Sequence, residues 1–114
     1  MAVLDYCEMP VGRVAQEVAF DEKAFGWRFT HYGPDYAAHE EGPCQLALNG
    51  TADTQQARAI LAVIRVDAIE AARAQVVAAG GTIAVDIYAY PGGRRFHFTD
   101  PAGLELACYE PAEG

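Results

Sequence analysis

The sequence predicts an α+β fold of two βαβββ modules, which form a curved mixed sheet around a cleft with the helices outside. Three observations lead to this fold class. Two segments carry apolar residues at helical spacing, the remaining apolar runs are short and strand-like, and the same order of elements occurs twice. The 114 residues suit a single domain. We place the first module at residues 1–56 and the second at residues 57–114.

The first module begins with a strand-like run at residues 3–11. A helix is predicted from Gly12 to Phe25, because Val14 and Val18 continue one apolar stripe. Gly26 should end this helix, as glycine commonly does at a helix C-terminus. Three further strand-like runs follow, at residues 27–32, 35–40 and 44–49.

The second module repeats the pattern, beginning with a strand-like run at residues 59–66. Asp67 is the expected N-cap of its helix, with Glu70 three residues later as in a capping box. Gly80 and Gly81 should end the helix. Three strand-like runs follow, at residues 82–90, 94–100 and 104–110, and the turn Asp100-Pro101-Ala102-Gly103 precedes the last of them.

The two halves align with two different offsets. A shift of 55 residues places Val11 on Val66 and Gly26 on Gly81, whereas a shift of 60 places Tyr36 on Phe96, Leu46 on Leu106 and Ala47 on Ala107. The difference of five residues predicts an insertion in the second half. We assign it to a loop with the sequence YAYPGG at residues 88–93.

Composition excludes several classes of function. The net charge is −8, from eight basic and sixteen acidic residues, which argues against a nucleic-acid binder. The N-terminus lacks a signal peptide's basic region and apolar run, and no run suits a membrane span, so we expect a cytoplasmic protein. The three cysteines, Cys7, Cys44 and Cys108, match no zinc spacing and are expected to be buried, unpaired thiols.

Three stretches together resemble the vicinal oxygen chelate superfamily, which includes glyoxalase I, bleomycin resistance proteins and extradiol dioxygenases. They are CEMPVGRVAQEVAFDEKAFGW, VIRVDAIEAARAQVVAAGGTI and FTDPAGLELACY, and the resemblance covers nearly the whole chain in order. The resemblance implies two βαβββ modules around a cleft and a homodimer. In metal-using members it also implies a divalent ion, held by the first and last strands of each module.

The resemblance places the four metal-ligand positions on Tyr6, Ala47, Leu61 and Ala107. Alanine and leucine have no donor atoms, and one phenol is a poor site for a divalent ion. We therefore predict no metal centre and no cofactor. Ala107 stands where a metal-using relative would carry a carboxylate.

Strand alternation predicts which side chains line the cleft. Asp5 and Cys7 fall on the other face of their strand. In the run at residues 94–100, Phe96 and Phe98 are expected to face the helices. The predicted ligand-binding residues are Tyr6, Glu8, Trp27, Gln45, Arg65, Arg95, His97, Glu105 and Tyr109. For Trp27 a second interpretation stays open, in which it packs against the end of the first helix.

Two interpretations of the charged residues remain open. In the first, Glu8 or Glu105 is a general base, His97 is its acid partner, and Arg65 holds an anionic substrate. In the second, the same groups form ion pairs across strands: Glu8 with Arg65, and Glu105 with Arg95. No catalytic residue is therefore assigned, and Glu8, His97 and Glu105 are candidates.

Three classes of function are compatible with these features. The first is a metal-free protein that binds a small molecule in the central cleft, as bleomycin resistance proteins bind a cationic drug. The second is a lyase, isomerase or dioxygenase of the superfamily with an atypical or absent metal site, so whether the chain is an enzyme stays open. The third is an interaction module without a ligand. The expected partners are a small molecule and a second copy of the chain, with no nucleic acid and no membrane.

Overall fold

The computed structural model describes residues 2–51 and 60–113, which belong to two compact units. One unit spans Tyr6–Ile60, and the other combines residues 2–5 with residues 61–113. The expected module boundary at residues 56 and 57 lies outside the described residues. The cleft expected between the modules remains a prediction.

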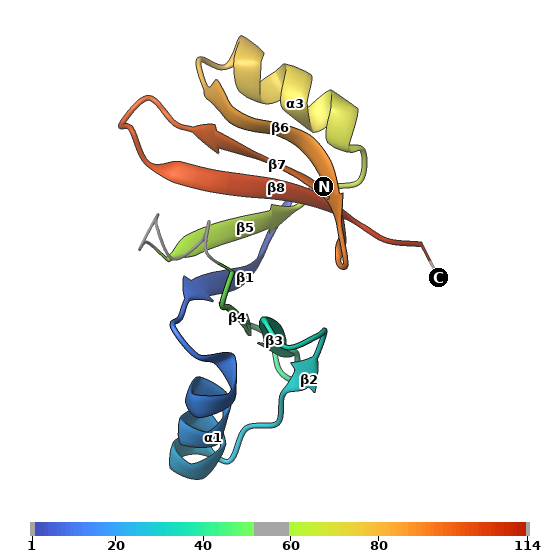
Figure 1. Ribbon diagram of the computed structural model, residues 1–114. Coiled ribbons are helices and arrows are strands. Elements are labelled where there is room, and N and C mark those ends of the chain that lie inside the picture. The colour runs from blue at the N-terminus through green and yellow to red at the C-terminus, as the bar shows by residue number, and fades with distance from the viewer. Residues whose placement is uncertain (1, 52–59, 114) are drawn as a thin grey trace. The chain divides into compact units, whose positions relative to one another are not determined.

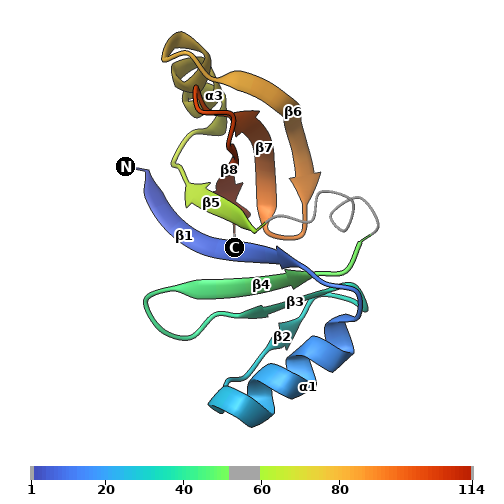
Figure 2. The same ribbon diagram turned by 90° about the vertical axis from the view of Figure 1, so that its left-hand side faces the viewer.

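The first unit contains one helix and four strands: β1 (Val3–Pro10), α1 (Val14–Phe25), β2 (Thr30–His31), β3 (Tyr36–His39) and β4 (Gln45–Asn49). The strand order is β2-β3-β4-β1. β1 and β4 are parallel, whereas the β2–β3 and β3–β4 pairs are antiparallel. Figure 2 shows α1 beside β2, β3 and β4. Residues 3–5 of β1 belong to the other unit.

The second unit repeats this order: β5 (Leu61–Arg65), α3 (Ile69–Ala78), β6 (Thr82–Tyr90), β7 (Gly93–Thr99) and β8 (Glu105–Pro111). Its strand order is β5-β8-β7-β6 (Figure 1), with β5 and β8 parallel and the other pairs antiparallel. First and last strands thus pair in parallel in both units. The predicted α+β class with two βαβββ modules and mixed strand directions is confirmed.

The predicted loop at residues 88–93 is wrong. Tyr88, Ala89 and Tyr90 continue β6, and β7 already starts at Gly93, so only Pro91 and Gly92 turn between the strands. The alternation of two tyrosines around an alanine suits a half-buried strand better than a loop. Gly93 has φ 140°, and a Cβ there would lie 2.1 Å from the carbonyl oxygen of Glu110, so only glycine fits this close approach.

The expected equivalence of Tyr36 and Phe96 is also wrong by one residue. Ala37 pairs with Leu48 on β4, and Phe96 pairs with Cys108 on β8. Leu48 and Cys108 are equivalent under the shift of 60, so Ala37 is the counterpart of Phe96. Tyr36 is instead the counterpart of Arg95, which puts both of these side chains on the face away from the helix.

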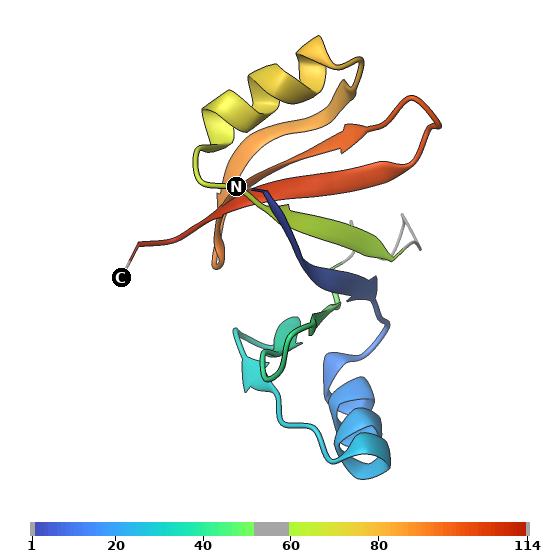
Figure 3. The same ribbon diagram turned by 180° about the vertical axis from the view of Figure 1, so that it is seen from behind.

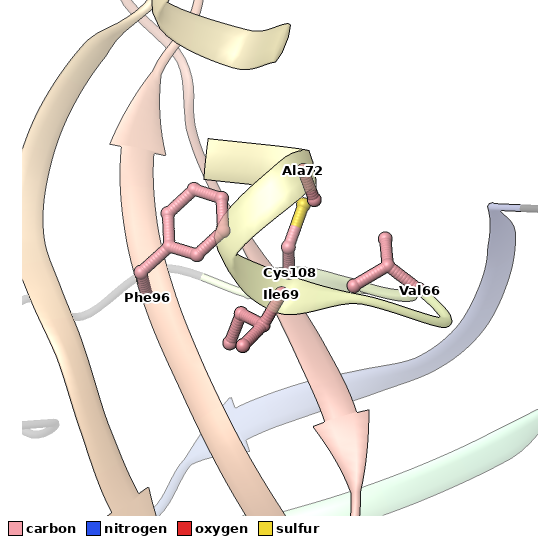
Figure 4. Close-up of a cluster of buried hydrophobic side chains, with 5 residues drawn as sticks. All are labelled: Val66, Ile69, Ala72, Phe96 and Cys108. Atoms are coloured by element: carbon pink, nitrogen blue, oxygen red, sulfur yellow. The ribbon is translucent and has the colours of Figure 1, made fainter. Parts of the chain in front are cut away.

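Each unit has its own apolar core between its helix and its sheet. In the first unit this core contains Val14, Val18, Ala37 and Leu48. In the second unit α3 contacts β6, β7 and β8 (Figure 3), and the core contains Val66, Ile69, Ala72, Phe96 and Cys108 (Figure 4). Burial of these side chains holds each helix to its sheet and fixes which strand face remains for polar residues.

The helices end near the glycines that were predicted to end them, but the predicted N-cap at Asp67 is wrong. Gly26 has φ 71° and ends α1, and Gly80 has φ 105° just after α3. The N-cap of α3 is Ala68, not Asp67, and it makes no side-chain capping bond. The backbone N–H of Ile69 is instead accepted by Glu110 Oε1 at 3.2 Å, from β8.

Two ion pairs made by Arg94 lie next to this cap. Arg94 donates to Glu70 Oε2 at 2.7 Å and to Glu110 Oε2 at 3.2 Å, so it joins the first turn of α3 to β8. The Arg94 guanidinium lowers the pKa of Glu70. Glu70 thus pairs with a neighbouring strand, where the sequence predicted a capping box within the helix.

The turn before β8 has the predicted chemistry. Asp100 Oδ1 accepts the backbone N–H of Ala102 at 2.9 Å and that of Leu104 at 3.0 Å, and Gly103 has φ 86°. Such aspartate-centred turns mimic backbone hydrogen bonding. The turn sets the register in which Glu105 starts β8 opposite Thr99.

Of the three cysteines, only Cys108 is buried as expected. Cys7 is half-buried and Cys44 is exposed, just before β4. Burial raises the pKa of the Cys108 thiol, which suits its place in the apolar core.

Candidate functional site

A polar surface lies on the face of β7 and β8 opposite α3. Phe96 and Cys108 pack against the helix, so alternation directs Arg95, His97 and Tyr109 the other way. Ala107 lies opposite His97 in the strand pair and is fully buried. The packing of Phe96 and Phe98 toward the helix agrees with the expected alternation, and a role of the opposite face in ligand binding stays a prediction.

Glu105 is the exposed end of this surface and lies next to His97. His97 Nδ1 lies 2.8 Å from Glu105 Oε2, within hydrogen-bond distance, and the two residues are diagonal neighbours on β7 and β8. The side chain of Glu105 is 45% exposed and that of His97 is 12% exposed. Within the described chain, Glu105 Oε1 has no hydrogen-bond partner, so this carboxylate presents an open acceptor to solvent.

Tyr88 and Arg95 continue the polar network behind His97. The Tyr88 hydroxyl lies 3.0 Å from His97 Nε2, and Arg95 Nε donates to the same hydroxyl oxygen. The Arg95 guanidinium also lies over two tyrosine rings, 4.7 Å from the centroid of Tyr90 and 5.7 Å from that of Tyr88. These cation–π contacts stabilise a buried arginine.

Tyr109 closes the other end of the surface. Its ring meets that of Tyr90 edge to face, and its hydroxyl donates to Asp5 Oδ2. Asp5, which alternation assigned to the other strand face, thus contacts a predicted site residue. The hydroxyl of Tyr109 is engaged with the start of β1, whereas the carboxylate of Glu105 stays accessible.

The first unit carries a second polar group, centred on Glu8. The Glu8 carboxylate is 1% exposed, and it accepts the Tyr36 hydroxyl at 2.8 Å and Asn49 Nδ2–H at 3.2 Å. Glu8 lies opposite Ala47 on the face away from α1. A carboxylate this deeply buried needs such donors, which explains the polar residues around it.

The remaining predicted site residues lie in different surroundings. Tyr6 is buried and pairs with the half-buried Gln45 across β1 and β4. Arg65 is exposed at the end of β5, opposite Tyr109. Trp27 stacks on His39 with ring centroids 4.6 Å apart and contacts Phe25, the last residue of α1, at 5.0 Å. These contacts are those of the packing interpretation of Trp27.

The structure excludes the ion pair that was predicted for Glu105, but it does not test the ion pair that was predicted for Glu8. The expected Glu105–Arg95 ion pair is wrong, because Arg95 lies opposite Tyr109, four residues along β8 from Glu105. Glu105 instead contacts His97, and an acid–base role for these two residues stays a prediction. The pairing of Glu8 with Arg65 stays a prediction.

The four metal-ligand positions implied by the resemblance do not fit a metal ion. Ala47 and Ala107 are buried side chains without donors, and Leu61 is apolar. Among the residues that the structure describes, no group of three or more histidine, cysteine, aspartate or glutamate side chains could hold a metal ion. No step of a mechanism is therefore assigned to a metal.

Four residues of these networks were missed from the sequence: Asp5, Tyr36, Tyr88 and Tyr90. Tyr88 and Tyr90 were placed both in the strand-like run at residues 82–90, which is right, and in a loop at residues 88–93, which is wrong. Tyr36 was aligned with a core phenylalanine. The contact of Asp5 with Tyr109 joins residues 104 positions apart, and no local pattern could have found it.

The chain belongs to the Glyoxalase/Bleomycin resistance protein/Dioxygenase superfamily, whose family model matches residues 3–107. This confirms the resemblance on which the four ligand positions were assigned. No curated protein sequence matches the chain.

Solved structures with similar folds carry different names. Methylmalonyl-CoA epimerase from Mycobacterium tuberculosis is 14% identical, with 97% of this chain and 89% of that chain covered and a TM-score of 0.80. A hypothetical protein from Bacillus halodurans C-125 is 16% identical, with coverages of 99% and 96% and a TM-score of 0.80. A Legionella pneumophila protein called NAD-dependent benzaldehyde dehydrogenase is 14% identical, with coverages of 94% and 98% and a TM-score of 0.77. At these identities the likeness is one of fold.

In the described part of the chain, neither helix has the length and hydropathy that crossing a membrane requires.

Proposed function

We propose that this protein binds a small organic molecule without a metal ion, and that the ligand meets the surface formed by Tyr88, His97 and Glu105. The observation that carries the proposal is the carboxylate of Glu105. One of its oxygens is held by His97, and the other is open within the described chain. A carboxylate fixed in this way accepts a hydrogen bond from a ligand at little cost in side-chain entropy.

The charge of the chain supports a ligand with a cationic or hydrogen-bond-donating group. A net charge of −8 attracts cations over several ångströms, and an ammonium–carboxylate contact is worth about 1.5–3 kcal/mol. Bleomycin resistance proteins, which give the family part of its name, are the model for this function.

Calorimetry with metal-free bleomycin and with spermidine, both cationic probes, tests the proposal. We expect saturable binding of at least one probe in the presence of EDTA, and an affinity about tenfold weaker for Glu105→Gln. Glu40→Gln is the matched control, because Glu40 is an exposed carboxylate that accepts the Tyr32 hydroxyl in the other unit. Binding that appears only after zinc, nickel, manganese or cobalt is added would overturn metal independence.

A second candidate is an enzyme that transfers protons, and the His97–Glu105 pair favours it. In this function Glu105 removes a proton from a carbon next to a carbonyl group and returns it, while His97 steadies the carboxylate. Methylmalonyl-CoA is the first probe, because structural relatives are called methylmalonyl-CoA epimerases. Deuterium exchange at its C-2 in D₂O, lost in Glu105→Gln, would support catalysis, and exchange at the rate without protein would contradict it.

A homodimer in the cytoplasm is part of the same proposal. The strand β6 lies at one end of its unit's strand order, and unpaired strand edges favour association. The register shifts in β6 weigh against edge pairing, so an interface through other surfaces is expected. Light scattering at micromolar concentration should give twice the mass of one chain, and the mass of one chain would contradict the dimer.

A further inference from the structure

We infer that Tyr88 is a positioning residue that fixes the proton of His97 on Nδ1 and so holds Glu105 with one oxygen toward the ligand. The inference rests on the proposed small-molecule site and assigns a role to a residue outside the sequence-predicted set. It follows from which atoms donate and which accept along four side chains. Their order runs from Arg95 at the buried end, through Tyr88 and His97, to Glu105 at the exposed end.

The order starts at Arg95, which is 5% exposed. A guanidinium has only donors, so the bond between Arg95 Nε and the Tyr88 hydroxyl uses a lone pair of the phenol oxygen. The phenol proton is then free to point to His97 Nε2, 3.0 Å away. Donation from the charged Arg95 also polarises the hydroxyl and makes it a better donor.

The order ends at Glu105, which as a carboxylate has only acceptors. Its 2.8 Å contact with His97 Nδ1 therefore requires the proton on that nitrogen. A neutral imidazole has one donor and one acceptor, so Nε2 must accept from Tyr88. All three bonds then run in one direction, from Arg95 through Tyr88 and His97 to Glu105.

The opposite tautomer fits badly. With the proton on Nε2, the lone pair of Nδ1 would face the Glu105 carboxylate at 2.8 Å, and Glu105 would turn away into solvent. Removing the Tyr88 hydroxyl lets Nε2 carry the proton without a competing donor. The consequence is a less ordered Glu105 and a weaker contact with the ligand.

Nitrogen NMR of the histidine rings, recorded on the ligand-free chain at about pH 8 where an ordinary imidazole is neutral, tests the inference. We expect His97 to show a protonated Nδ1 and an unprotonated Nε2. In Tyr88→Phe this pattern should change to a mixture of tautomers. Tyr32→Phe is the matched control: its hydroxyl bonds Glu40 in the other unit, so His97 should keep its signals.

Two results would overturn the inference. One is a wild-type His97 with the proton on Nε2, a measurement that needs no variant. The other is a folded Tyr88→Phe chain, judged by its amide spectrum, in which the His97 tautomer is unchanged. If His97 shows the expected tautomers but the unchanged chain binds neither bleomycin nor spermidine, the proposed function is contradicted. The role of Tyr88 toward His97 is then still supported.

Discussion

The two modules share one topology but use their carboxylates differently. Glu8 lies on the first strand of its module, 1% exposed and held by Tyr36 and Asn49. Val63 occupies the equivalent place in the second module. There the carboxylate is Glu105 at the start of the last strand, where the first module has Gln45. One carboxylate is thus enclosed by donors, and the other is half-open to solvent.

This difference shows how a repeated backbone can hold different chemistry. Parallel pairing of the first and last strands puts equivalent positions on the same sheet face in both modules, whatever residues occupy them. A buried carboxylate with fixed donors adds to the stability of its module, whereas an exposed carboxylate backed by one histidine remains available to a ligand. Four substitutions or conditions test this comparison, from the largest expected effect to the smallest.

The largest effect is expected in the core of the second module. Phe96 is fully buried against α3, and Ala37 is its smaller counterpart in the first module. Phe96→Ala should lower the free energy of unfolding by about 3–5 kcal/mol, because it leaves a cavity. Urea denaturation measures this. A loss below about 1 kcal/mol would mean that the second module does not depend on this core.

An intermediate effect is expected at Glu8. Glu8→Gln keeps the size of the side chain but removes the charge that its donors solvate, which should cost about 1–3 kcal/mol. Urea denaturation of this variant is compared with that of Glu40→Gln, which removes an exposed carboxylate of the same unit. The difference separates the effect of burial on stability from the effect of losing a charge. Equal stability of the two variants would contradict the structural role of Glu8.

A small effect on stability is expected at Glu105. Its contact with His97 is partly exposed, and even exposed ion pairs contribute only about 1 kcal/mol or less. Glu105→Gln should therefore leave urea denaturation almost unchanged while it weakens probe binding in calorimetry. A large loss of stability without a change in affinity would make Glu105 architectural and Glu8 the better ligand-binding candidate.

The smallest effect is expected from pH, with opposite signs in the two modules. In the second, Arg94 and Arg73 lower the pKa of Glu70 and Asp86, so these pairs stabilise above about pH 4.5 and are lost as pH falls through the lowered pKa values. In the first, the hydrogen bond to Glu40 raises the pKa of Tyr32 above 10.0. Its contribution is complete below that pH and is lost as pH rises through the raised pKa.

Melting temperatures across this pH range test the difference. Arg73→Ala with Arg94→Ala should flatten the acid side of the profile, and Tyr32→Phe should flatten the alkaline side. Added salt should weaken the acid-side effect, since both carboxylates are at the surface. A profile that neither change affects would exclude these pairs as contributors to stability.

The sequence predicted the features that depend on local patterns. The bounds of β6 and the glycine ends of both helices follow from alternation and from positive φ, and alternation also brought His97 and Glu105 to one face. Features that depend on distant residues were not predictable. The equivalence of Ala37 and Phe96 needed the strand pairing, and the bond of Tyr88 to His97 needed the register of β6 on β7, which contains shifts.

The start of α3 has a consequence for the order of folding. Its first turn is capped by a carboxylate 41 residues later in the chain, so a ribosome that has just made the helix has not yet made the group that completes it. Nascent chains that end before Glu110 should have a frayed first turn, whereas chains that include β8 should protect the amide of Ile69 from hydrogen exchange. We therefore expect the first turn of α3 to be completed only after β8 has been made.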